Sequence, residues 1–215
     1  MSSAEETGIA MSSMRAVESS LKQEIVRVAC ELGTELGEDG LTMRGIASRL
    51  GVSATALYQH FEGKSSILRA IRFHGLTLIN DVLASCFEHA DPLERVGAAS
   101  RTYIQFARDN PWLYGVLFTG EALNHDGLTD EEVDLVSQSH YRVIACFREA
   151  KTAGLLHGDA VPEMATLQLW AANHGVASLL INNRLGGENE TMMVRDDAAF
   201  IDAFVETTLR GFRRC

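Results

Sequence analysis

The sequence predicts an all-α protein, because its prolines stand where helices begin and no stretch has the pattern of a strand. Pro92, Pro111 and Pro162 suit the first turn of a helix, where the N–H group that proline lacks would have no intrahelical partner. No alternating β-branched run with a hairpin turn occurs in the chain. At 215 residues the chain is long enough to bury a core and to divide into two domains, with about nine helices.

The N-terminal part is expected to contain an arm followed by one amphipathic helix. Residues 1–17 are rich in Ser, Ala and Met and lack periodicity, so they are expected to form a disordered arm. A helix over about residues 18–37 places apolar side chains on one face and ends in the loop 37–40. Residues 18–64 are expected to form the first domain, and residues 65–215 the second.

The remaining helices are expected to build the larger domain. The fourth begins at Lys64 or Ser65 and reaches about residue 88, so it belongs to both domains and links them mechanically. Asn110 is expected to cap a short helix after it. The helices after the fourth are expected at about residues 91–109, 111–119, 129–151, 161–184 and 196–213. The last two are apolar over wide arcs, and a homodimer would bury the surface that a monomer leaves exposed. These arcs include Leu167, Trp170, Ile181, Phe200, Phe204 and Phe212.

Residues 41–68 have the pattern of two short helices joined by a tight turn. Thr42 is a good N-cap, and Gly51 follows the first helix where a left-handed backbone is wanted. Ser53 is placed to cap the second helix, over about residues 54–60. The expected inward positions are Ile46, Ala47, Leu50, Val52, Leu57 and Phe61. A helical hairpin in some all-α domain would explain a glycine turn alone, but the whole combination favours a DNA-binding helix-turn-helix.

The second helix of this motif presents small and polar groups outward. Ala54, Thr55, Tyr58 and Gln59 would form a face that suits entry into a major groove. Thr55, Gln59 and His60 are able to read base edges, and glutamine suits adenine. For His60 the alternative is a packing and capping role at the end of the helix.

The motif resembles the N-terminal domain of the TetR (tetracycline repressor) family of bacterial transcription regulators, over about residues 20–70. The residues that carry the resemblance are Leu41, Thr42, Arg44, Ile46, Ala47, Gly51-Val52-Ser53, Leu57-Tyr58-Gln59-His60-Phe61, Lys64, Ile67 and Leu68. It implies a homeodomain-like, three-helix DNA-binding domain followed by a helical effector and dimerisation domain. Gly45 departs from the pattern of a good helix, at a cost of roughly 1 kcal/mol relative to alanine.

The resemblance also implies which side chains contact DNA. The hydroxyl of Tyr58 would contact a phosphate, and Thr42 and Arg44 would clamp the backbone of the neighbouring strand. Lys64 stands at a helix N-terminus, which attracts phosphate. For Tyr58 and Lys64 the alternative is an ordinary exposed residue. The expected DNA-contacting set is Thr42, Arg44, Ser53, Ala54, Thr55, Tyr58, Gln59, His60 and Lys64.

Residues 169–179 resemble the Trp…His-Gly signature of one subclass of TetR-family C-terminal domains. Aromatic side chains there and upstream would line a cavity for an apolar or aromatic effector, with plain core packing as the alternative. The expected walls are Trp112, Phe118, Trp170 and His174. For His174 an ordinary buried, hydrogen-bonded histidine is the alternative. A metal role is disfavoured because no other His or Cys lies at ligand spacing, and no cofactor is expected.

The charge distribution agrees with a double-stranded DNA partner although the net charge is −10. Residues 42–73 carry five cations and one anion, a local charge of +4, whereas residues 74–215 carry 11 cations and 20 anions. Phosphate attraction acts through the local surface, within a Debye length of about 8–10 Å. A basic segment at residues 42–73 is therefore compatible with DNA binding, although residues 74–215 are acidic.

Composition and motifs exclude several other classes of protein. Four widely spaced cysteines favour free thiols in a reducing cytoplasm, three of them buried and one terminal. The sequence shows no signal segment and no apolar run of about 18 residues, so no membrane partner is expected. Nucleophile-elbow and phosphate-loop motifs are absent, which disfavours an enzyme. The expected function is a repressor that binds a palindromic operator as a homodimer and is released by a small effector. A constitutive DNA-binding protein with a solid second domain is the alternative.

Overall fold

The fold was obtained as a computed structural model that describes residues 3–118, 127–185 and 196–214, with side chains from residue 20 onward. Within these ranges the chain forms nine α-helices, one short 3₁₀ helix and one isolated β-bridge, between Leu156 and Arg213. The all-α prediction is therefore confirmed. The sequence also predicts a loop at residues 120–127 and a linker at residues 186–189, and apart from Gly127 both lie outside the described ranges.

The first helix, α1 (Ser3–Gly40), is longer than the sequence suggested. It continues through the segment 3–17, for which a disordered arm was expected. Alanine, glutamate and methionine are good helix formers, and extending an existing helix avoids the cost of nucleation. The expected end is found at Gly37, whose φ of 72° and ψ of −179° leave the helical region.

The helix-turn-helix consists of α2 (Met43–Leu50) and α3 (Ala54–Tyr58). The hydroxyl of Thr42 accepts a hydrogen bond from Gly45 N at 3.0 Å, and that of Ser53 accepts one from Ala56 N at 3.2 Å. Gly51 adopts the left-handed conformation, with φ 70° and ψ 25°. The predicted caps and turn are therefore present.

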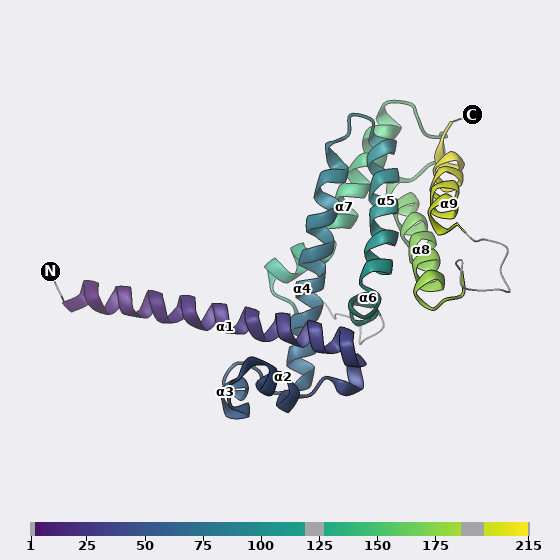
Figure 1. Cartoon of the computed structure of the whole chain (residues 1–215). Helices are drawn as coiled ribbons and strands as arrows, with labels where there is room; N and C mark the ends of the chain where they lie inside the picture. Colours follow the sequence, from purple (N-terminus) through teal and green to yellow (C-terminus); the bar gives the residue numbers. More distant parts are fainter. Residues whose placement is uncertain (1–2, 119–126, 186–195, 215) are drawn as a thin grey trace.

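The long connecting helix, α4 (Lys64–Ala84), begins in the N-terminal domain and continues into the C-terminal helices (Figure 1). It ends slightly before the predicted residue 88, because the chain tightens into the 3₁₀ helix η1 (Ser85–Glu88). One end of α4 thus packs with α1 and the other with α5, α6 and α7.

The C-terminal helices are α5 (Pro92–Asp109), α6 (Pro111–Phe118), α7 (Asp130–Thr152), α8 (Pro162–Ile181) and α9 (Asp197–Phe212). Each of the three prolines opens a helix, as predicted. Asn110 directly precedes α6 as predicted, and its carbonyl oxygen accepts the first hydrogen bond of that helix from Tyr114 N at 2.8 Å. Its side-chain amide donates to Phe106 O at 3.0 Å and so serves the end of α5 as well.

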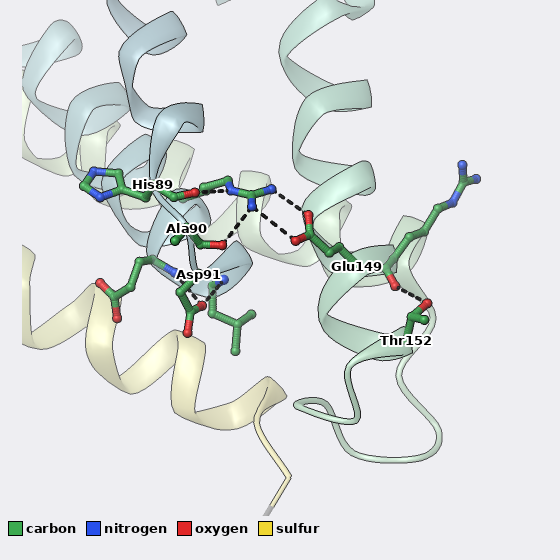
Figure 2. Close-up of polar contacts among 9 residues, drawn as sticks. His89, Ala90, Asp91, Glu149 and Thr152 are labelled. Carbon is green, nitrogen blue, oxygen red and sulfur yellow. Dashed lines mark hydrogen bonds and ion pairs between the residues drawn. The ribbon is translucent and has the colours of Figure 1, made fainter.

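α5 lies at the centre of the larger domain and packs against α4, α6, α7, α8 and α9. Its first turn is fixed by Arg95, which donates to the carbonyl oxygens of His89 and Ala90 at 2.6 and 2.9 Å. The same guanidinium pairs with Glu149 of α7 at 2.6 Å (Figure 2). α5 is thereby joined to α7 and to the turn that follows η1.

The apolar core runs continuously from α1 to α9 through the described residues. None of the described helices combines the length and low charge of a membrane-spanning segment. Of the four cysteines, Cys86 and Cys146 are buried but Cys30 is only partly buried, and Cys215 lies outside the described residues. Burial raises the pKa of the Cys30 thiol to about 11. Of the three thiols expected to be buried, Cys86 and Cys146 are buried and Cys30 is only partly so.

Candidate DNA interface and interior cavity

α3 offers a polar face that is free for contact with DNA. Leu57 is fully buried and anchors the helix to the core, whereas Tyr58 on the opposite side is 54% exposed. Ala54, Thr55 and Gln59 are also exposed. The structure thus brings together on one surface the small and polar side chains that the sequence assigned to groove reading.

The caps and the basic residues lie around this face. The Thr42 and Ser53 hydroxyls accept hydrogen bonds from backbone N–H groups, so each keeps its own O–H to donate to a phosphate. Arg44 is exposed and has no hydrogen-bond or ion-pair partner among the described residues. Lys64 instead donates to the carbonyl oxygen of Glu38 at the end of α1. His60 is half-buried, which leaves both of its predicted roles open.

Two of the five cations counted in the basic segment 42–73 point away from the α3 face. Arg69 pairs with Glu132 of α7 at 2.7 Å, and Arg72 donates to Val116 O of α6 at 3.1 Å. A third, Arg49, pairs with Glu35 at 2.7 Å. The local charge of +4 therefore overstates the attraction for phosphate, because Arg69 and Arg72 join α4 to the larger domain.

α6 contacts the DNA-binding part of the chain at one closely packed point. A Cβ atom on Gly33 of α1 would lie 2.1 Å from two ring atoms of Trp112, so the indole rests directly on the helix backbone. Trp112 was predicted to line the effector cavity, but it does not. Its place is at the junction of α1 and α6, because the small residue at position 33 leaves room for a large ring there.

A cavity of about 380 Å³ lies inside the larger domain, between α4, η1, α5, α6, α7 and α8. This volume falls within the usual range of small-molecule sites, about 300–1,000 Å³. Its apolar walls include Leu83, Val96, Leu117, Val143 and Leu169. Phe118 and Trp170, two of the predicted wall residues, line it as well.

His174 lies behind this wall and does not line the cavity. Its Nδ1 is hydrogen-bonded to the Tyr114 hydroxyl at 2.6 Å, which in turn lies 2.9 Å from the Tyr103 hydroxyl. The imidazole also contacts the rings of Phe118 and Trp170, with centroids 5.3 and 5.9 Å away. Burial raises the pKa of Tyr103 to about 12, so this phenol is neutral near pH 7. The geometry agrees with the alternative of a hydrogen-bonded histidine, in a position that supports the wall.

The cavity is also lined by polar residues that the sequence analysis did not single out: Asn80, Ser100, Ser139, His140, Thr166 and Asn173. Asn80 donates to Leu135 O at 2.9 Å and accepts a hydrogen bond from Ser139. Asn173 donates to Ser100 Oγ at 3.1 Å. The sequence does contain a signal for Asn173, because this polar residue interrupts the apolar run of residues 169–180. The sequence analysis chose its neighbours Trp170 and His174 instead. Within the described ranges no group of three His, Cys, Asp or Glu residues is arranged to hold a metal ion.

Comparison with known proteins identifies both parts of the chain. Residues 25–71 match the family model described as bacterial regulatory proteins of the tetR family, and residues 96–207 match the tetracyclin repressor-like C-terminal domain. The chain belongs to the TetR family. It is therefore a DNA-binding transcription regulator with a helix-turn-helix. The finer resemblance to the Trp…His-Gly subclass stays a prediction.

Individual relatives of this TetR-family chain share only part of its length. The nucleoid occlusion factor SlmA of Haemophilus influenzae is 34% identical over 104 residues, which is 47% of each protein. The tetracycline repressor of class A from transposon 1721 of Escherichia coli is 49% identical over 47 residues, 22% of each. The chain thus spans about half the length, or less, of these curated relatives.

Solved structures share the whole fold. A Rhodococcus sp. RHA1 protein of unknown function superposes with a TM-score of 0.76 at 22% identity, covering 90% of this chain and 96% of that one. The ketosteroid transcriptional regulator KstR2 of Mycobacterium tuberculosis gives a TM-score of 0.63 at 15% identity, covering 90% and 95%. At such identities the likeness extends to the fold alone.

Proposed function

We propose that this regulator is a ligand-responsive repressor that binds a palindromic operator as a homodimer and leaves it when a small, largely apolar or aromatic molecule occupies the cavity. The cavity of about 380 Å³ carries the proposal, because α4 forms one of its walls and also begins beside the DNA-binding helices. Residues 18–64 would form the DNA-binding domain and residues 65–215 the effector and dimerisation domain. Such a repressor would act in the cytoplasm.

A homodimer is supported by apolar side chains that remain exposed on α8. Met164, Leu167 and Leu179 are 54%, 51% and 43% exposed, and they lie close to one helical face. Phe200 and Phe204 of α9 stack on each other at a centroid distance of 6.5 Å and are only half-buried. A second copy of the chain would bury this surface. Two-fold symmetry would then place the two α3 helices in major grooves about one helical turn apart.

On the operator, Tyr58, Arg44, Lys64 and the hydroxyls of Thr42 and Ser53 would contact phosphates. Thr55 and Gln59 would read base edges, and Ala54 would allow close approach to them. The Lys64 ammonium has three N–H donors, so it can contact a phosphate oxygen in addition to the carbonyl oxygen of Glu38. A hydrogen bond to the charged phosphate is stronger than one to the neutral carbonyl.

Release would follow from a shift between two arrangements of α4 and α6. Leu76, Ile79 and Leu83 of α4 and Phe118 of α6 line the cavity. At its other end α6 holds the α1 backbone through Trp112. A ligand that fits better with one arrangement would change the spacing of the two α3 helices, and each tenfold loss of DNA affinity needs about 1.4 kcal/mol of differential binding.

The alternative is constitutive DNA binding, and the similarity to proteins named nucleoid occlusion factors is the observation that favours it. A solid interior would strengthen this alternative, whereas the observed cavity supports ligand control. The discriminating observation is the affinity for an operator, obtained by selection from random DNA, in the presence of cavity-binding compounds. A regulator under ligand control loses affinity, and a constitutive binder retains it.

The dimer is tested by Leu167→Glu, which places a charge within the exposed apolar face of α8. We expect sedimentation to show a dimer for the wild type and a monomer for the variant, with operator affinity lost in parallel. Tyr141→Glu is a matched control, because it also replaces an exposed apolar side chain by one negative charge, on α7. A wild-type protein that stays monomeric at micromolar concentration would contradict this part of the proposal.

A further inference from the structure

The described residues that line the cavity offer no group that would balance a charged ligand. No Asp, Glu, Lys or Arg is among the described residues that line it. Its histidine, His140, is packed edge-on against Trp170 at a centroid distance of 5.5 Å. Burial lowers the pKa of His140 below its ordinary value of 6.5, so the imidazole is neutral at pH 7. An ionised ligand would lose its hydration here without gaining a counter-charge.

One polar atom in the wall is without a partner. Asn173 is only 6% exposed, and its Nδ2 donates to Ser100 Oγ at 3.1 Å. Its Oδ1 is buried and accepts no hydrogen bond from any described residue. Asn80, across the cavity, has partners for both ends of its amide, Leu135 O and Ser139 Oγ. A buried acceptor without a donor is costly, so a ligand that supplies one gains affinity.

The orientation of this amide can adapt to a ligand. Oδ1 has no accessible surface in this structure, but Asn173 lines the cavity and the χ2 torsion of asparagine is broad, so a rotation about χ2 would turn Oδ1 toward a ligand. Ser100 is 1% exposed and holds the opposite end of the amide. Asn173 and Ser100 come from α8 and α5, whose packing fixes the backbone that carries both side chains.

We infer that the ligand of this cavity is a neutral, mostly apolar molecule with a hydroxyl or N–H group that donates a hydrogen bond to Asn173 Oδ1. This inference rests on the proposed function in one respect, that the occupant of the cavity is the effector. Carboxylates of the same shape are excluded by the uncharged walls. Ethers of the same shape are disfavoured because they lack the donor.

The test uses matched probes on two apolar scaffolds. Biphenyl-4-ol, 4-methoxybiphenyl and biphenyl-4-carboxylate share one scaffold, and decan-1-ol and decanoate share the other. Calorimetric titration of the full-length protein is expected to show the phenol binding about tenfold more tightly than the ether, the gain of one satisfied buried acceptor. Each carboxylate is expected to bind at least about a hundredfold more weakly than its alcohol.

Asn173→Leu removes the acceptor and keeps a side chain of similar size. We expect the preference for phenol over ether to fall below about twofold. Asn173→Ala serves the same purpose if the leucine variant folds poorly. Val143→Ala is the matched control: it removes apolar wall area, so it weakens the phenol and the ether by a similar factor and keeps their ratio.

The inference is overturned if the carboxylates bind as tightly as the alcohols, if the ratio of phenol to ether survives Asn173→Leu, or if neither alcohol binds. Operator binding measured in parallel separates it from the proposed function. An alcohol that occupies the cavity without changing operator affinity would support the ligand chemistry and contradict ligand control. A carboxylate that fills the cavity and releases the operator would support ligand control and contradict the inferred ligand chemistry.

Discussion

The contact between Gly33 and Trp112 decides whether Gly33→Ala stabilises or destabilises the protein. A Cβ atom at position 33 would lie 2.1 Å from Cη2 and Cζ2 of Trp112 and 2.6 Å from Cε2, far inside van der Waals contact. Replacing glycine by alanine inside a helix ordinarily stabilises by roughly 1 kcal/mol. Here the overpacking, which typically costs about 1–3 kcal/mol, should outweigh that gain. Gly33→Ala is therefore expected to destabilise the protein.

The assay is denaturant unfolding at a fixed protein concentration, in a double-mutant cycle with Trp112→Ala. In the wild-type background Gly33→Ala should lower the free energy of unfolding by about 1–2 kcal/mol. Each kcal/mol lost should lower Tm by about 2–4 °C in a chain of this size. In the Trp112→Ala background the same change should be neutral or stabilising by up to about 1 kcal/mol, because the ring is gone. An equal loss in both backgrounds would refute the packing described for α1 and α6.

Three further predictions concern DNA contacts and pH. Arg44→Ala should reduce the salt slope of operator binding by about one unit, whereas Arg69→Ala should leave it unchanged because Arg69 pairs with Glu132; equal slopes for both would contradict the distinction. Gln59→Ala should flatten the preference at one operator position by about 1–3 kcal/mol, and an unchanged consensus after selection from random DNA would remove Gln59 from the base readers. His140 has a folded-state pKa below 6.5, so the unfolded chain takes up its proton first as the pH falls. Stability should therefore fall as the pH drops below about 6.5, and His140→Phe should reduce the difference in Tm between about pH 7.5 and 5.5.

The helix boundaries and the DNA-binding motif were predictable because their signals are local. A cap, a proline and a left-handed glycine act within one turn of chain, so Thr42, Gly51 and Pro92 have the same meaning in any helical fold. Asn110 shows the limit of this reasoning. It begins α6 as predicted, but the local sequence does not show that its side-chain amide also donates to the end of α5.

The walls of the cavity were less predictable because they depend on packing between distant helices. α8 is apolar around most of its circumference, so periodicity does not reveal which face turns inward. Phe118 and Trp170 line the observed cavity, but Trp112 packs on a glycine 79 positions earlier in the chain, at position 33. The roles of Arg69 and Arg72 were hidden for the same reason, since counting charge along the chain does not show that their partners lie on α7 and α6.

The central claim is that occupation of the cavity and binding of the operator oppose each other through α4 and α6. Its most direct test is one titration with biphenyl-4-ol followed in two ways, by calorimetry for the cavity and by fluorescence anisotropy of a labelled operator. The account predicts that operator affinity falls at least tenfold as the cavity fills, and that Asn173→Leu moves both curves to higher ligand concentration together. Operator affinity that stays constant while the cavity is saturated would contradict it.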